Sequence, residues 1–129
     1  MKKDSYSCGL DASLSLMGGK WKFLIIWNLG TGKKRFGELR RLVGGVSEKV
    51  LIQDLKELAD DGIVTRIDHK EVPPKVEYEL TELGETLVEA CHPLCHWGNK
   101  HMSHILGLEE PKRSNDGLKR KSAAAAIES

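Results

Sequence analysis

The sequence has no apolar run that approaches the roughly 20 residues a helix needs to cross a bilayer. Its first residues also lack the continuous apolar core of a signal peptide. We therefore expect no membrane-spanning segment and a cytoplasmic location. At 129 residues the chain is long enough for one domain with a real core, followed by a tail.

Cysteine is scarce, and the three cysteines are an odd number whose spacing matches no disulfide framework. Cys8, Cys91 and Cys95 are therefore expected to be free thiols. Cys91 and Cys95 share one helix face, as do His92 and His96, so that each face would offer two metal ligands. Because no second pair of cysteines exists elsewhere, we expect buried thiols and solvent-facing histidines, with no metal and no other cofactor.

Catalytic motifs are also missing. The chain has no phosphate-binding glycine loop, no nucleophile elbow and no pair of carboxylates that would be buried together. These gaps argue against an enzyme.

The net charge is only +1 and by itself neither favours nor excludes a polyanionic partner. The charges are segregated, however, because residues 33–56 carry a local charge of +4, while acidic residues gather at 57–61 and 82–89. The basic residues of the first region are Lys33, Lys34, Arg35, Arg40, Arg41, Lys49 and Lys56, against Glu38, Glu48 and Asp54. A local basic region supplies the field that phosphate contacts need.

An amphipathic helix is predicted over residues 48–61, because leucines recur on one side of it and long polar side chains on the other. Ser47 is a good N-cap, since its hydroxyl can accept from an unpaired backbone N–H, and Gly62 supplies a left-handed stop. The leucines are Leu51, Leu55 and Leu58, and the polar face carries Lys49, Gln53, Lys56 and Asp60.

A short β-hairpin is expected next, with strands at residues 63–67 and 76–80. The first segment is rich in β-branched residues, and apolar and acidic residues alternate in the second, which is typical of one buried face. Pro73 and Pro74 cannot occupy a central strand and therefore mark the tip, at residues 69–75. That tip carries His69, Lys70 and Lys75.

Three helices are expected before this unit. Residues 11–17 form the first, and residues 20–29, which are apolar on nearly every side, form the second at the centre of the core. After a turn at 30–34, residues 36–43 form the third. A glycine pair then leads into the amphipathic helix, and this order is that of a helix-turn-helix unit.

A long last helix begins at Glu82, is capped by Thr81 and carries an apolar stripe. Because the domain already has a core, we expect this stripe and the first helix to form a dimer contact. The alternative is that the helix folds back on its own domain. We assign residues 1–106 to the domain and residues 107–129 to a flexible, polar and alanine-rich tail.

Together these elements predict a mainly α protein with a small β-hairpin wing, an α+β fold of the winged helix-turn-helix class. The sequence also resembles the HxlR family of bacterial winged-helix transcriptional regulators (MarR/HxlR-like) over about residues 8–98. The matching residues are Gly18-Gly19-Lys20-Trp21, Arg35-Phe36, Glu38-Leu39, Ser47 with the three leucines and Gly62, Pro73-Pro74-Lys75-Val76-Glu77-Tyr78, Leu80-Thr81 and Gly84.

The resemblance implies a homodimeric DNA-binding regulator. We expect it to repress or activate transcription by occupying an operator, and a twofold-symmetric dimer should bind an inverted repeat. We expect the first half of the 48–61 helix to enter the major groove, with Ser47 and Lys49 on phosphates and Val50 and Gln53 closest to base edges. We expect the flanking phosphates to be bound by Arg35, Arg40 and Lys56. On the wing, Lys70 and Lys75 are expected to reach the adjacent minor groove or backbone.

In several members of that family a cysteine just before the first helix senses oxidants or electrophiles, and Cys8 stands there, followed by Gly9 where proline is usual. Unpaired N–H groups and the macrodipole at a helix N-terminus stabilise a thiolate, although Asp11 opposes this effect. A sulfenic acid at Cys8 would condense with a thiol of the partner subunit, for which Cys91 and Cys95 are candidates.

Three alternatives stay open. The first is that Cys8 is an inert, packed side chain. The second is that the effector is a small molecule and Cys8 has no part in sensing it, and the third is that the winged helix binds an acidic protein in place of DNA.

Overall fold

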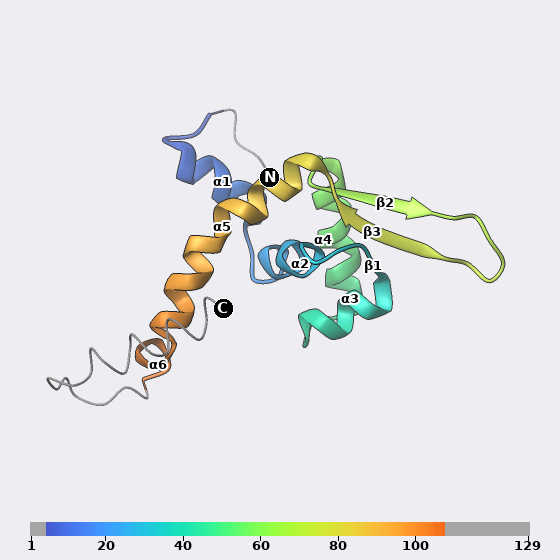
Figure 1. Cartoon of the computed structure of the whole chain (residues 1–129). Coiled ribbons are helices and arrows are strands. Elements are labelled where there is room, and N and C mark those ends of the chain that lie inside the picture. Colours follow the sequence, from blue (N-terminus) through green and yellow to red (C-terminus); the bar gives the residue numbers. More distant parts are fainter. Residues whose placement is uncertain (1–4, 108–129) are drawn as a thin grey trace, which may run out of the picture. The chain divides into compact units, whose positions relative to one another are not determined.

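The computed structural model describes residues 5–107, whose contacts divide them into two units, residues 5–88 and 89–107. The chain is mainly helical with one small antiparallel sheet, so the predicted fold class is confirmed (Figure 1). No helix among the described residues is long and apolar enough to span a membrane. The elements are α1 (Gly9–Met17), α2 (Lys22–Leu29), β1 (Lys34–Arg35), α3 (Phe36–Val43), α4 (Glu48–Asp60), β2 (Val64–Asp68), β3 (Val76–Leu80), α5 (Glu82–Lys100) and α6 (Met102–Ile105).

Helix α2 is central in the first unit, where it contacts α1, α3, α4 and β3. Its residues Ile25 and Ile26 are fully buried and cluster with the three leucines of α4. Each such side chain contributes about 1.5–3 kcal/mol through the burial of apolar surface. This cluster confirms both the central helix and the buried face that the sequence predicts, and it fixes which side of α4 faces solvent.

The turn before α4 and the end of that helix follow the predicted local chemistry. Gly44 and Gly45 have φ values of 73° and 81°, in the left-handed region that favours glycine. The backbone N–H of Val50 donates to Oγ of Ser47 at 3.1 Å, which confirms the N-cap. Gly62, with φ of 78°, follows the last turn as predicted.

The sheet has a third strand that the sequence analysis missed. The strand order is β1-β3-β2, and Lys34 and Arg35 pair with Tyr78 and Glu77 of β3. The predicted turn over 30–34 is therefore wrong at its last residue. A strand of two residues has no period of its own, and only its partner strand defines it. Because β3 is central, all its residues are half-buried, in place of the alternation expected from its sequence.

Helices α1 and α2 also differ from the predicted bounds at their first residues. Helix α1 begins at Gly9, two positions earlier than expected, with Cys8 as its N-cap residue in an extended conformation. Helix α2 begins at Lys22, two positions later, after Trp21. The predicted tail lies outside the described residues except for Gly107.

The start of α5 is fastened to the turn between α4 and β2. The hydroxyl of Thr81 donates to the carbonyl of Gly62 at 2.6 Å and accepts from the N–H of Gly84 at 3.0 Å, so Thr81 is the predicted cap. A Cβ at position 84 would lie 2.3 Å from the carbonyl oxygen of Ile63. Only glycine fits at this close approach.

Candidate nucleic-acid interface

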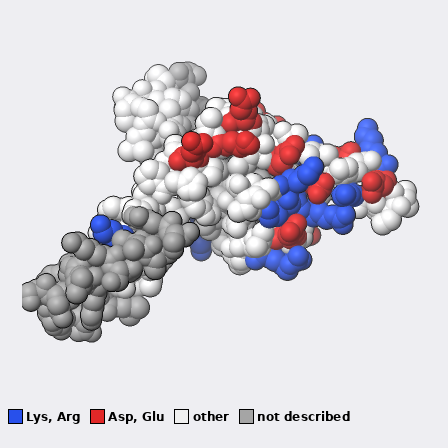
Figure 2. Space-filling model, in the orientation of Figure 1, with Lys and Arg blue, Asp and Glu red and all other residues white. Residues whose placement is uncertain are grey.

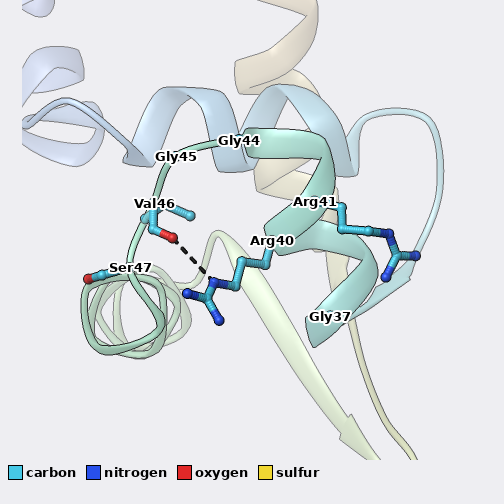
Figure 3. A pocket seen from close by; sticks show the side chains of 7 residues that line it. All are labelled: Gly37, Arg40, Arg41, Gly44, Gly45, Val46 and Ser47. Atoms are coloured by element: carbon cyan, nitrogen blue, oxygen red, sulfur yellow. Dashed lines mark hydrogen bonds between the residues drawn. The ribbon is translucent and has the colours of Figure 1, made fainter.

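The turn between α3 and α4 borders an open hollow of about 740 Å³ (Figure 3). Arg40 points toward the start of α4, and its Nε donates to the carbonyl of Val46 at 3.3 Å. Arg41 extends from α3 in another direction, beside Gly37. The lining residues are Gly37, Arg40, Arg41, Gly44, Gly45, Val46 and Ser47. The other guanidinium N–H groups are donors whose planar geometry suits phosphate oxygens.

The first turn of α4 is exposed next to this hollow. Ser47, Lys49 and Val50 all face solvent there. Because Oγ of Ser47 accepts from the backbone in the cap, its hydroxyl proton is free to be donated outward. The helix N-terminus adds the positive end of the macrodipole. The structure therefore brings Arg40 and Ser47, two of the predicted site residues, to one hollow, and adds Arg41, which the sequence analysis counted among the basic residues but did not assign to the site.

Gln53 is exposed on α4 one turn further along, but its side chain has a partner within the protein. Its Nε2 donates to Oε2 of Glu57 at 2.7 Å, and Oε1 of Glu57 pairs with Nζ of Lys22 on α2 at 2.6 Å. The hydrogen bond from Lys22, followed by that from Gln53, holds the pKa of Glu57 below its usual range. Sequence analysis missed Glu57, although its spacing of four residues from Gln53 was a usable signal.

Lys56 is also exposed on α4, but it lines a different hollow, of about 300 Å³, between α4 and the sheet. It shares that hollow with Arg66 of β2, another basic residue absent from the predicted site. Arg66 pairs with Asp68 at 3.8 Å. The structure therefore does not place Lys56 in the hollow that holds Arg40.

The hairpin tip carries the two predicted wing lysines on one loop that projects away from the helices (Figure 1). Lys70 has φ of 53°, and its N–H donates to Oδ1 of Asp68 at 2.9 Å. The carbonyl of Lys75 accepts from the N–H of His69 at 2.9 Å and closes the loop. The His69 side chain bonds Glu77 at 2.7 Å, which lowers the pKa of that carboxyl.

Arg35 occupies the junction of β1 and α3, where it is the N-cap residue of α3 and is exposed.

In Figure 2 the Lys and Arg side chains gather over the hairpin and α3, with a few acids among them, whereas acids predominate over the beginning of α5. The predicted segregation of charge is therefore visible on one face of the molecule.

This arrangement of elements matches a known family. A family model described as HxlR-like helix-turn-helix matches residues 16–105. The chain belongs to the HxlR-like helix-turn-helix family. Its relative YtcD of Bacillus subtilis (strain 168), an uncharacterized HTH-type transcriptional regulator, is 43% identical over 126 residues, which are 95% of this chain and 100% of YtcD.

Solved structures agree with that assignment. The redox regulator HypR in its reduced form is 38% identical to this HxlR-like chain, with a TM-score of 0.72, over 78% of this chain and 99% of HypR. Diamide-treated YodB from B. subtilis is 36% identical, with a TM-score of 0.61, over 74% and 96% of the two chains. The chain is therefore a transcriptional regulator of the helix-turn-helix class, which binds DNA and is not a class of enzyme.

Cys8 of this HxlR-like regulator is exposed at the N-cap of α1. The backbone N–H groups of Asp11 and then of Leu10, at the start of the helix, lower the pKa of the thiol. The Asp11 carboxylate accepts from the backbone N–H and the hydroxyl of Ser7, at 3.0 and 3.2 Å. Desolvation opposes this lowering of the Cys8 pKa, and the net shift is downward.

The other two cysteines lie on α5 in the second unit. Cys91 is buried, which raises the pKa of its thiol, and Cys95 is half-buried. His92 is exposed and His96 is half-buried. Among the described residues no group of three or more His, Cys, Asp or Glu side chains is arranged to hold a metal ion.

Large apolar side chains are exposed on α1 and α5. Leu10 and Leu14 of α1 are 68% and 53% exposed, and Leu94 and Trp97 of α5 are 62% and 55% exposed. Each of these two helices therefore presents exposed apolar surface.

Proposed function

We propose that this regulator binds an inverted-repeat operator as a homodimer, with α4 in the major groove and the β2–β3 hairpin as a wing against the adjacent backbone or minor groove. The observation that carries this proposal is the exposed first turn of α4 beside the glycine-lined hollow that holds Arg40 and Arg41. A glycine-rich surface lets a sugar-phosphate backbone approach closely, and the two guanidinium groups supply donors there.

The residues divide into two roles. Val50 and Gln53 are proposed to face base edges, because they are exposed just after the N-terminus of the recognition helix. The other candidates are proposed to bind phosphates and so to position the helix. They are Arg35, Arg40, Arg41, Ser47, Lys49 and Lys56, together with Lys70 and Lys75 of the wing.

Two substitutions test this division. Lys75→Ala is expected to weaken binding to all duplexes and to reduce the slope of log affinity against log salt by about one. Gln53→Ala is expected to leave that slope unchanged and to relax the base preference at one position of each half-site. The probe is a duplex that the wild-type chain selects from a randomised pool, compared with its single-base variants by gel shift.

The proposal is wrong if the wild-type chain enriches no sequence and retains all duplexes weakly, as a protein-binding module would. A selected duplex with two inverted half-sites about one helical turn apart, or a multiple of it, supports a twofold dimer. Direct repeats or a single site would contradict that geometry.

A second proposal concerns regulation, since Cys8 is an exposed thiol with a lowered pKa. We infer that an oxidant switches DNA binding through this residue. With diamide, the Cys8 thiolate adds to the N=N bond, and a second thiol displaces the resulting hydrazine to form a disulfide. The two thiols lose two electrons and two protons in total, and diamide takes them up. Cys95 of the partner subunit is the better second thiol, because Cys91 is buried.

Cys8→Ser tests this inference. The variant is expected to bind the selected duplex as tightly as the wild-type chain does, and to keep binding it after diamide treatment. The wild-type chain is expected to change its affinity and to migrate as a covalent dimer without reductant. If Cys8→Ser responds to diamide like the wild-type chain, Cys8 is not the switch.

A further inference from the structure

Gln53, the side chain proposed above to read a base, is hydrogen-bonded to Glu57, which is in turn paired with Lys22. Gln53 donates from Nε2 to Oε2 of Glu57 at 2.7 Å, and the other oxygen of Glu57 accepts from Nζ of Lys22 at 2.6 Å. Gln53 and Glu57 are one turn apart on α4, and Lys22 is the first residue of α2. The three side chains form a chain of contacts from the core helix to the exposed face of the recognition helix.

The chemistry of Glu57 fixes which way the Gln53 amide points. An ionised carboxylate accepts hydrogen bonds and cannot donate them, so it must meet the NH₂ end of the amide. The pKa of Glu57 is lowered by Lys22 and then by Gln53, which keeps the carboxylate ionised. The amide oxygen of Gln53 and its second N–H are therefore left for a ligand. Those two groups are the acceptor and donor that match N6 and N7 of adenine.

We propose that Glu57, anchored by Lys22, is a positioning residue that presents Gln53 for the bidentate reading of adenine. The inference rests on the proposed DNA-binding function and identifies what makes its base contact selective. Glu57 acts through Gln53 and makes no contact with the base.

The anchor on α2 explains why such a carboxylate is tolerated in a DNA-binding surface. An isolated Glu57 would repel the phosphates, but its ion pair with Lys22 neutralises that charge. The Lys22 side chain is only 14% exposed, so the pair is partly shielded from solvent. Burial raises the pKa of Asp54, the neighbouring carboxyl on α4, and the charge of Lys22 opposes that rise. Because α2 packs in the core, the position of Lys22 is set by the fold.

An anchored Gln53 needs no further ordering when it meets the base. Ordering one flexible side chain at an interface weakens binding by about 2- to 10-fold. Loss of Glu57 is therefore expected to reduce the preference for adenine at the Gln53 position by about that factor, without changing the salt slope of binding.

The experiment uses the full chain and the selected duplex, together with its three variants at the position where Gln53→Ala relaxes selection. The measured quantity is the ratio of affinity for adenine to affinity for each other base. Glu57→Ala is expected to lower that ratio 2- to 10-fold. Glu57→Gln keeps an acceptor for Gln53 and is expected to preserve more of the ratio. Asp60→Ala is the matched control, since it removes one negative charge from the same helix.

Two further variants complete the test. Lys22→Met combined with Glu57→Ala removes the whole pair, so that no partly buried ammonium group is left alone and misfolding is avoided. Gln53→Ala combined with Glu57→Ala is expected to lose no more preference than Gln53→Ala does, because both changes act on one contact.

The inference is overturned if Glu57→Ala and the Lys22→Met double variant keep the wild-type preference while Gln53→Ala loses it. A different failure is recognisable too. If Gln53→Ala itself leaves the preference unchanged while DNA is still bound, then the base-reading role of Gln53 and this inference both fall, and the DNA-binding proposal stands.

Discussion

Cys8 and Cys91 show how the surroundings of one residue type change its chemistry. The sulfur of Cys8 is exposed at the start of α1, where the backbone N–H groups of Asp11 and then of Leu10 lower the pKa of its thiol. The sulfur of Cys91 is buried, and desolvation of the thiolate raises its pKa. The thiolate is the nucleophile, so the two residues are expected to differ in reactivity at the same pH.

The first prediction is that Cys8 is alkylated at a lower pH than Cys91. Because a lowered pKa means that the thiolate forms earlier as pH rises, iodoacetamide labelling of Cys8 should reach half its maximum rate below the pH of an ordinary cysteine, about 8.5. Labelling of Cys91 should reach half its maximum rate above that pH, because burial raises its pKa. Brief labelling of the reduced chain followed by peptide mass spectrometry gives both profiles. Equal midpoints would contradict the prediction.

The second prediction concerns Gly84 at the start of α5. Gly84→Ala would place a Cβ 2.3 Å from the carbonyl oxygen of Ile63, and relieving that clash should lower the free energy of unfolding by about 1–3 kcal/mol. Gly98→Ala in the same helix is the control, since a Cβ there meets no atom within 4 Å. It should raise the free energy of unfolding by about 0.5–1 kcal/mol. Urea unfolding at one protein concentration compares them.

Among the elements, the wing depends on its backbone for its shape. The N–H of Lys70 donates to Asp68, and the carbonyl of Lys75 accepts from the N–H of His69. Below this loop, β2 and β3 pair along their whole length, from Asp68 and Val76 to Val64 and Leu80. Lys70 adopts a left-handed φ of 53°, which is uncommon for any residue with a Cβ. Glycine would therefore adopt the backbone conformation of position 70 more readily than lysine does.

The third prediction follows from that conformation. Lys70→Gly removes the wing charge at a φ that glycine adopts readily, so stability should be kept while the salt slope of DNA binding falls by about one. Lys100→Ala, which removes a charge from the end of α5 in the other unit, should leave the slope unchanged. Equal slopes for Lys70→Gly and the wild-type chain would place Lys70 away from phosphate. Gel shifts at several salt concentrations give the slopes.

At the scale of the whole molecule, the exposed apolar residues of α1 and α5 need a partner. Single exposed leucines are common, but several large exposed apolar side chains on one helix, as on α1 and again on α5, indicate a surface for interaction. In the homodimer proposed above, a second copy of this chain would cover these side chains.

The fourth prediction is that the chain has twice its monomer mass in solution and that Leu94→Glu or Trp97→Glu reduces it to the monomer. Both side chains are more than half exposed, so the charge should disrupt association without unfolding the subunit. Leu42→Glu on α3, also exposed, is the control and should stay dimeric. Light scattering on a sizing column measures the mass. A monomeric wild-type chain would refute the dimer.

Local patterns in the sequence are sufficient for most of the elements. The leucine period of α4, the Ser47 cap, the glycine stops and the Thr81 cap each depend on neighbours within a few residues. The bounds of α3 and β3 agree with the predicted ranges, α4 ends one residue earlier than predicted, and β2 lies one residue later than the predicted range 63–67. The same patterns identified the family, because its motifs are short and contiguous.

Contacts between distant residues needed the tertiary structure. β1 exists only through its pairing with β3, more than 40 positions later in the sequence. Lys22 reaches Glu57 only because α2 packs against α4. Gly84 is required by a carbonyl of another element. The sequence by itself thus determined which helix is suited to read DNA, since amphipathicity and capping are local. The fold decided how Glu57, the partner of Gln53, is anchored on that helix, because Lys22 lies 35 positions before Glu57 in the sequence.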